Sequence, residues 1–224
     1  MLQFKELTLA DKATIQGYTL TSNRRNCDLS FANLCSWRFL YQTEFAEMDG
    51  YLILRFRLNK ELSYMMPVGQ GNLQPVILAM IADAESLGLP FVMRGVSVRM
   101  RADLEQTFPD KFQFESNRDY ADYIYLRDDL ATLRGKKFQA KRNHVNKFLR
   151  LYPDFTYYEL TPELVPECLA LEAQWAEETQ QTNTAALESE RRSLTYALEH
   201  FHELDLVGGV LCVAGKMAAF TYGT

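Results

Sequence analysis

A run of positive charge near the middle of the chain constrains the fold more than any other feature of the sequence. From Arg134 to Arg150 there are seven Lys or Arg residues and no Asp or Glu. The next forty residues, 151–190, contain nine acids and no Lys or Arg. So dense a cationic block cannot enter a hydrophobic core. It forms either a solvated helix face that attracts the acidic block, or an anion site for the phosphates of a nucleotide, a tRNA or a lipid headgroup.

The remaining composition is that of an ordinary globular protein. The 224 residues are 47% hydrophobic and 24% charged, which excludes disordered and fibrous classes. The net charge of −5 argues against a general nucleic-acid binder, so any such binding must be local. The four cysteines are scattered without a CxxC pair, and neither a zinc ribbon nor a disulfide framework is expected.

The sequence predicts neither a membrane span nor a secretion signal. The longest uncharged window, Leu62–Ala82, is interrupted by prolines and glycines. The first six residues, Met-Leu-Gln-Phe-Lys-Glu, show no basic segment followed by an apolar one. We therefore expect a cytoplasmic protein.

Hydrophobic periodicity predicts a mixed α/β fold. Helical spacing is expected after Asp11, in Ser30–Tyr41, after Asn72, in Arg99–Phe108, through the basic block, after Thr161 and around Leu187–Phe201. Strands are predicted at Phe4–Leu9, Tyr51–Leu58, Leu62–Val68, Phe91–Val96, Phe112–Glu115, Asp122–Leu126, Phe155–Leu160, Val207–Val213 and Met217–Tyr222.

These elements predict an internal repeat. The order strand, helix, helix, hairpin begins at Phe4 and again at Phe155. We expect a first domain over residues 1–127, a basic helical connector over 128–153, and the start of a second domain over 154–224. The first copy continues into further elements whereas the second stops at Thr224, so the second domain is expected to be truncated.

The predicted order of elements is similar to that of the GNAT (Gcn5-related N-acetyltransferase) superfamily. There, the loop after the fourth strand carries Gln/Arg-x-x-Gly-x-Gly/Ala and wraps the pyrophosphate of an acyl-coenzyme A. In this chain the spacing falls on Met66–Gly71, with Met66 where the superfamily prefers Gln or Arg. Glycines allow close approach of backbone to phosphate, and a helix N-terminus at Asn72 would offer N–H groups. A plain strand-to-helix turn would look the same.

Further motifs resemble a family of bacterial proteins related to the C-terminal domain of phosphatidylglycerol lysyltransferases. They are Asp119–Tyr125, Leu133–Lys137 and Lys141–His144, with Phe31–Leu34 and Trp37 earlier in the chain. The resemblance covers nearly the whole chain. It implies tandem GNAT-like acyl-CoA N-acyltransferase domains, as in the Fem-type transferases that use aminoacyl-tRNA.

Such transfer needs a positioned ester or thioester, a donor for its oxyanion and often a base. The candidate catalytic residues are Asp122, Tyr123 and His144. The candidate phosphate- or donor-binding residues are Gly69, Gln70, Gly71, Asn72, Arg134, Lys137, Lys141 and Arg142. No metal site is expected.

Two functions remain open at this point. The first is an acyl or aminoacyl transferase with acyl-CoA or aminoacyl-tRNA as co-substrate, no tightly bound cofactor, and an unknown acceptor that could be a membrane lipid. The second is a non-catalytic GNAT-fold binding module that docks an anionic small molecule, a tRNA or another anionic partner through residues 134–150. The sequence does not fix the oligomeric state.

Overall fold

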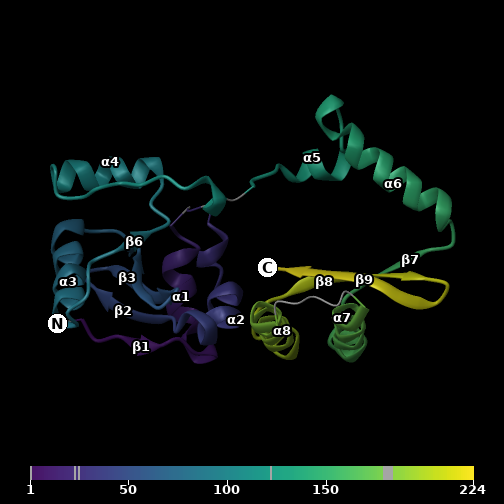
Figure 1. The fold of residues 1–224 in the computed structure, drawn as a ribbon, viewed down its shortest axis with the longest axis horizontal. Coiled ribbons are helices and arrows are strands. Elements are labelled where there is room, and N and C mark those ends of the chain that lie inside the picture. The colour runs from purple at the N-terminus through teal and green to yellow at the C-terminus, as the bar shows by residue number, and fades with distance from the viewer. Residues whose placement is uncertain (1, 23, 25, 122, 179–183) are drawn as a thin grey trace. The chain divides into compact units, whose positions relative to one another are not determined.

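The computed structural model describes residues 2–22, 24, 26–121, 123–178 and 184–224 and divides into two compact units, Met1–Tyr120 and Ala121–Thr224 (Figure 1). The sequence placed its first boundary after residue 127 and treated 128–153 as a connector. In the structure these connector residues belong to the second unit.

The first unit is a mixed sheet with helices on both faces. Its strands are β1 (Lys5–Glu6), β2 (Glu44–Met48), β3 (Tyr51–Leu58), β4 (Glu61–Met65), β5 (Val68–Gly69) and β6 (Met93–Arg94). Its helices of eight or more residues are α1 (Lys12–Thr19), α2 (Phe31–Tyr41), α3 (Leu73–Ser86) and α4 (Val98–Thr107). The sheet order is β1-β2-β3-β4-β6 with β5 also on β3, and β6 is parallel to β4. This confirms the predicted mixed α/β fold.

Turn chemistry builds the centre of this sheet. The β2–β3 hairpin turns at Asp49 and Gly50, both with positive φ (47° and 79°), and the β3–β4 hairpin turns at Asn59 and Lys60 (52° and 69°). Positive φ at both central residues matches the right-handed twist of the flanking strands. Strand β2, which precedes the first of these turns, is absent from the strands that the sequence predicts.

Strand alternation sorts the core onto the two faces of β3. Tyr51 and Ile53 pack with Val76, Ile77 and Met80 of α3 in one buried cluster. Leu52 and Leu54, also buried, point to the opposite face because successive strand residues alternate, and α1 and α2 pack against β3. As predicted, Asn72 caps α3, accepting a hydrogen bond from the Gln74 N–H at 3.1 Å.

A charged network joins this sheet to α3. Arg55 of β3 donates from Nε to Glu44 Oε2 (2.7 Å) and from Nη1 to Asp83 Oδ2 (2.9 Å). The fully buried hydroxyl of Tyr64 on β4 donates to the same Asp83 oxygen at 2.5 Å. Burial, reinforced by this bond to a carboxylate, raises the pKa of Tyr64 well above its usual value. One guanidinium thus connects β2, β3 and α3.

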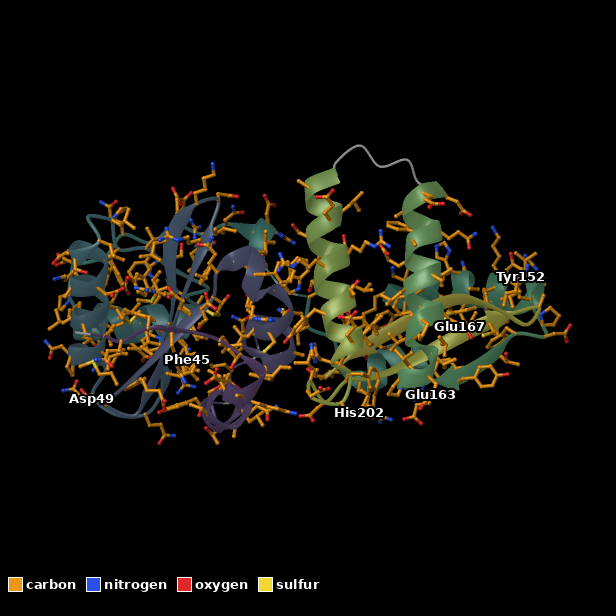
Figure 2. The ribbon with its side chains drawn as sticks, turned by 90° about the horizontal axis from the view of Figure 1, so that it is seen from below. Phe45, Asp49, Tyr152, Glu163, Glu167 and His202 are labelled. Carbon is orange, nitrogen blue, oxygen red and sulfur yellow. The ribbon has the colours of Figure 1, made fainter. Side chains whose placement is uncertain are left out.

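The second unit places two helices on one face of a three-stranded sheet. Its elements are α5 (Arg127–Thr132), α6 (Gln139–Leu151), β7 (Thr156–Glu159), α7 (Val165–Glu178), α8 (Thr184–Glu199), β8 (Val207–Val213) and β9 (Lys216–Gly223). The strand order is β7-β8-β9, antiparallel throughout. Helices α7 and α8 run side by side (Figure 2). The sulfur of buried Cys168 on α7 lies 3.8 Å from the sulfur of Met217 on β9.

The order of elements in the second unit repeats that of the first. β1, α1, α2, β2, β3 correspond to β7, α7, α8, β8, β9, with the same strand neighbours and the same antiparallel pairing. The hairpins predicted from the sequence, which begin at Tyr51 and at Val207, would align β3 with β8. The pairing instead aligns β2 with β8, because β7 pairs with β8 as β1 pairs with β2.

Two predicted strands are absent from the described residues. Residues 112–115 form no ladder, and neither do residues 123–126. The alternation in the first segment reflects packing of aromatic rings instead: Phe112 meets Phe108 edge to face at 5.7 Å, and Phe112 and Phe114 pack against the core. In the second segment the rings of Tyr123 and Tyr125 share one side, 6.4 Å apart.

Replacing Asp83 with Asn should lower the unfolding free energy of the first unit by roughly 3 kcal/mol, because it removes one of the two carboxylates that neutralise Arg55 and the charged acceptor of the Tyr64 hydroxyl. The matched control is Glu61→Gln in the same sheet: its pair with Arg94 is exposed and should contribute at most about 1 kcal/mol. Urea unfolding followed by Trp37 fluorescence in a Trp175→Phe background, which leaves one tryptophan, measures both. Equal losses for the two variants would contradict the network's role.

The raised pKa of Tyr64 predicts a stability change in alkali. Below the ordinary tyrosine pKa of about 10, Tyr64 is protonated in both the folded and the unfolded state, and the stabilisation from its buried hydroxyl is fully present. Above that pH the unfolded chain loses the hydroxyl proton first. The free energy of unfolding therefore falls as the pH rises towards the raised pKa of the folded state. The urea midpoint of the wild type should therefore drop more between pH 9 and 11 than that of Tyr64→Phe. If the urea midpoints of the wild type and of Tyr64→Phe fell in parallel with pH, Tyr64 would ionise as freely in the folded state as in the unfolded state, which would contradict the prediction.

Candidate functional site

The predicted glycine loop lies where β5 meets α3. Its backbone packs against the turn between β2 and β3: the Gln70 N–H donates to Gly50 O at 3.3 Å. The Tyr51 hydroxyl donates to Gly71 O at 3.0 Å. Gln70, Gly71 and Asn72 remain exposed to solvent on the other side of the loop.

This packing explains why the loop contains glycine. A Cβ at Gly69 would lie 2.1 Å from Gly50 O, and one at Gly71 would lie 2.9 Å from Asp49 O. Only glycine permits such close contact between backbones. The two glycines are therefore required by the turn whatever the loop binds, and the motif by itself does not indicate phosphate.

An arginine that the sequence analysis did not select braces the strand break before this loop. The guanidinium of Arg24 donates to the carbonyl oxygens of Met66 (2.6 Å) and Pro67, the residues that separate β4 from β5. Burial lowers the pKa of Arg24, while the charges of Tyr51 and Asp103 act in the opposite direction. Pro67 was the available signal, because a proline within a strand pattern marks a break whose carbonyls need partners.

The other predicted binding residues lie together in the second unit. Arg134 precedes a short 3-10 turn, Lys136–Phe138, which contains Lys137 and leads into α6 with Lys141 and Arg142. We call residues 123–152, which include α5 and α6, the basic arm.

Two of these cations stabilise the arm itself. Lys137 pairs with Asp129 of α5 at 2.9 Å. Arg142 donates from Nη1 to the carbonyl oxygens of Leu133 and Gly135 (2.8 Å for the second), just after α5. The guanidinium thus bonds two carbonyls of the loop that connects α5 to α6. Arg142 and Lys137 are therefore partly committed to folding α5 against α6.

The remaining predicted cations face solvent. Arg134 and Lys141 are exposed, and so are Lys136, Lys147 and Arg150 from the same block. A cluster of exposed cations with no intervening carboxylate is suited to bind phosphate groups by charge-assisted hydrogen bonds.

The predicted catalytic residues are not assembled into one described centre. Asp122 lies outside the described residues. Tyr123 is 84% exposed and stacks beside Tyr125 at an interplanar angle of 14°. His144 is exposed on α6. Both described candidates belong to the second unit, whereas the glycine loop belongs to the first.

The described residues form neither a metal cluster nor a membrane-spanning helix. Within the described ranges, no three His, Cys, Asp or Glu side chains gather as ligands for a metal ion. Nor does any helix among them combine the length and apolar character needed to cross a bilayer.

Comparisons with known proteins relate the chain to two solved structures. A protein of unknown function from Bacteroides thetaiotaomicron is 54% identical with a TM-score of 0.94; the match covers all of this chain and 76% of that one. L-PGS from Bacillus licheniformis is 16% identical with a TM-score of 0.54; the match covers 97% of this chain and 63% of that one, and shows a shared fold. No curated protein matches significantly.

The family comparison covers both units. The family model described as "Phosphatidylglycerol lysyltransferase, C-terminal" matches residues 20–224. That range contains the glycine loop, the basic arm and the second sheet. The chain therefore belongs to the family of the phosphatidylglycerol lysyltransferase C-terminal domain.

Proposed function

We propose that this chain is an aminoacyl transferase that takes its acyl group from an aminoacyl-tRNA and delivers it to a hydroxyl or amine of a lipid headgroup. The proposal extends the predicted acyl or aminoacyl transferase. The family's description names a lysyl group and phosphatidylglycerol, which makes a lipid hydroxyl the first acceptor to test.

The exposed cations of the basic arm carry the proposal. Seven Lys or Arg and no acid lie between residues 134 and 150, and five of the seven are exposed without the internal bonds of Lys137 and Arg142 recorded above. Without this block the chain would carry a net charge of −12, which favours the block as the place where phosphate groups bind.

The transfer is an attack of the acceptor on the ester that joins the amino acid to tRNA. The acceptor oxygen loses its proton, the new ester forms, and the tRNA hydroxyl leaves with a proton. In the proposal His144 or Asp122 accepts the first proton and the Tyr123 hydroxyl supplies the second. The cations bind and orient the donor and transfer no proton.

Acyl-CoA is the alternative donor, and tandem GNAT-like domains would be the fold that binds it. The recurrence of β1-α1-α2-β2-β3 in the second unit favours such a pair of related domains. The glycine loop weighs against a CoA site there, because the Gln70 N–H, a donor that a pyrophosphate would need, is bonded to Gly50 O.

Neutralising the arm should weaken tRNA binding and its salt dependence. Lys141→Gln, Lys147→Gln and Arg150→Gln together remove up to three phosphate contacts, which should reduce the slope of log K against log salt by roughly 2–3. The matched control is Arg57→Gln, Lys111→Gln and Lys216→Gln, three exposed cations outside the arm. Filter binding or gel shifts at several salt concentrations provide the slopes, and equal slopes for both triple variants would remove the arm from the tRNA site.

Transfer activity separates an enzyme from a binding module. Labelled lysyl-tRNA and vesicles containing phosphatidylglycerol should yield labelled lipid, with the rate falling about 10²–10⁴-fold in Tyr123→Phe or His144→Ala if the residue transfers a proton. Coenzyme A should leave the melting temperature unchanged. tRNA binding without transfer would support the non-catalytic binding module instead, and stabilisation by coenzyme A would favour the thioester donor.

A further inference from the structure

We infer that the basic arm is a membrane-docking element that lies on the surface of an anionic bilayer. This goes beyond the proposed function, because docking requires neither a donor nor transfer. Exposed hydrophobic residues, which neither the fold nor tRNA binding explains, indicate this role.

Hydrophobic exposure is concentrated in the arm. Among the described residues, nine of the eighteen exposed large hydrophobic side chains lie within residues 123–152. They are Tyr123, Ile124, Tyr125, Leu126, Leu130, Val145, Leu149, Leu151 and Tyr152. Single exposed hydrophobic residues are ordinary on protein surfaces, but a cluster of this kind indicates an interaction site.

Helix α6 separates its apolar and polar side chains. Val145 and Leu149, 47% and 44% exposed, lie one turn apart on one side. Lys147 is two residues from each of them, about 200° around the helix, and so lies on the opposite side. Lys141 lies one turn before Val145, where its aliphatic stem can follow the apolar side while its amine reaches upward to headgroups. This is the pattern of an interfacial helix.

The positive charge of the basic arm favours an anionic lipid surface as its partner. Residues 123–152 contain eight Lys or Arg and two Asp, a net charge of +6 in a chain of net charge −5. An α-helix with its side chains is about 10–12 Å across, close to the Debye length of ~8 Å at physiological salt. Lys141 and Arg142 at the margins of the apolar side, and Lys147 and Arg150 away from it, are therefore all attracted by an anionic lipid surface. Each contributes roughly 1 kcal/mol.

Other occupants fit less well. A second copy would bring +6 against +6, and like charges across an interface are unfavourable. RNA would satisfy the cations but not the aliphatic side chains, since nucleic-acid interfaces are more polar than protein interfaces. Tyrosines at both ends of the arm, Tyr123 and Tyr125 at one and Tyr152 (labelled in Figure 2) at the other, suit the bilayer interface.

The test is co-sedimentation of the full chain with vesicles in the absence of tRNA. The wild-type protein should bind vesicles that contain both phosphatidylcholine and phosphatidylglycerol. It should bind vesicles of phosphatidylcholine alone much more weakly. Val145→Gln with Leu149→Gln should reduce binding roughly tenfold or more. The control, Leu78→Gln with Leu87→Gln, changes two leucines of similar exposure (44% and 49%) in the α3 region and should change nothing.

A second readout reports insertion directly. In the Tyr152→Trp variant, the fluorescence of the new tryptophan should be quenched by lipids with brominated acyl chains, because its side chain would lie at the bilayer interface. The Val145/Leu149 variant should retain wild-type tRNA affinity, which shows that it is folded and separates membrane docking from donor binding. Equal vesicle binding by both double variants, or no quenching, would overturn the inference. A change of oligomeric state in the Val145/Leu149 variant would assign the surface to a second copy.

Discussion

The guanidinium of Arg55 is the interaction on which the first unit depends. A cation on the inner face of a central strand is acceptable only if its charge and its donors are satisfied, and Glu44 and Asp83 do both. The hydroxyl of Tyr64 completes the shell of Asp83. Because these four groups come from β2, β3, β4 and α3, the network fixes the helix against the sheet.

In the second unit, in contrast, most of the positive charge is exposed to solvent and is not buried. Lys137 and Arg142 are used internally, one on a carboxylate and one on backbone carbonyls, and they fold α5 against α6. The other five cations of the block are left exposed, and so are the apolar side chains beside them. The same short arm can therefore present phosphate-binding and bilayer-binding groups on different sides of one helix.

Several features of the candidate site were readable from the sequence in advance. The charge block, the Asn72 cap and the β3–β4 hairpin all follow from local chemistry. The Arg55–Asp83 contact left a weaker signal: Asp83 falls at a buried position of the helical stripe through Val76 and Met80, where a carboxylate requires a partner. The glycine motif alone left its role open, because sequence spacing cannot distinguish a backbone that approaches phosphate from one that approaches a neighbouring turn.

The sequence by itself determined the class of fold, the order of most elements and the position of the exposed charge, because helical and strand periodicity, capping and charge density are local properties. Tertiary structure decided the rest. Residues 112–115 alternate like a strand but form no strand ladder. Their aromatic rings pack against the hydrophobic core, and no neighbouring strand in the described part of the chain pairs with their backbone. The partners of Arg24, Arg55 and Arg142 were likewise set by the fold, since each guanidinium bonds groups that are distant in sequence or on another element.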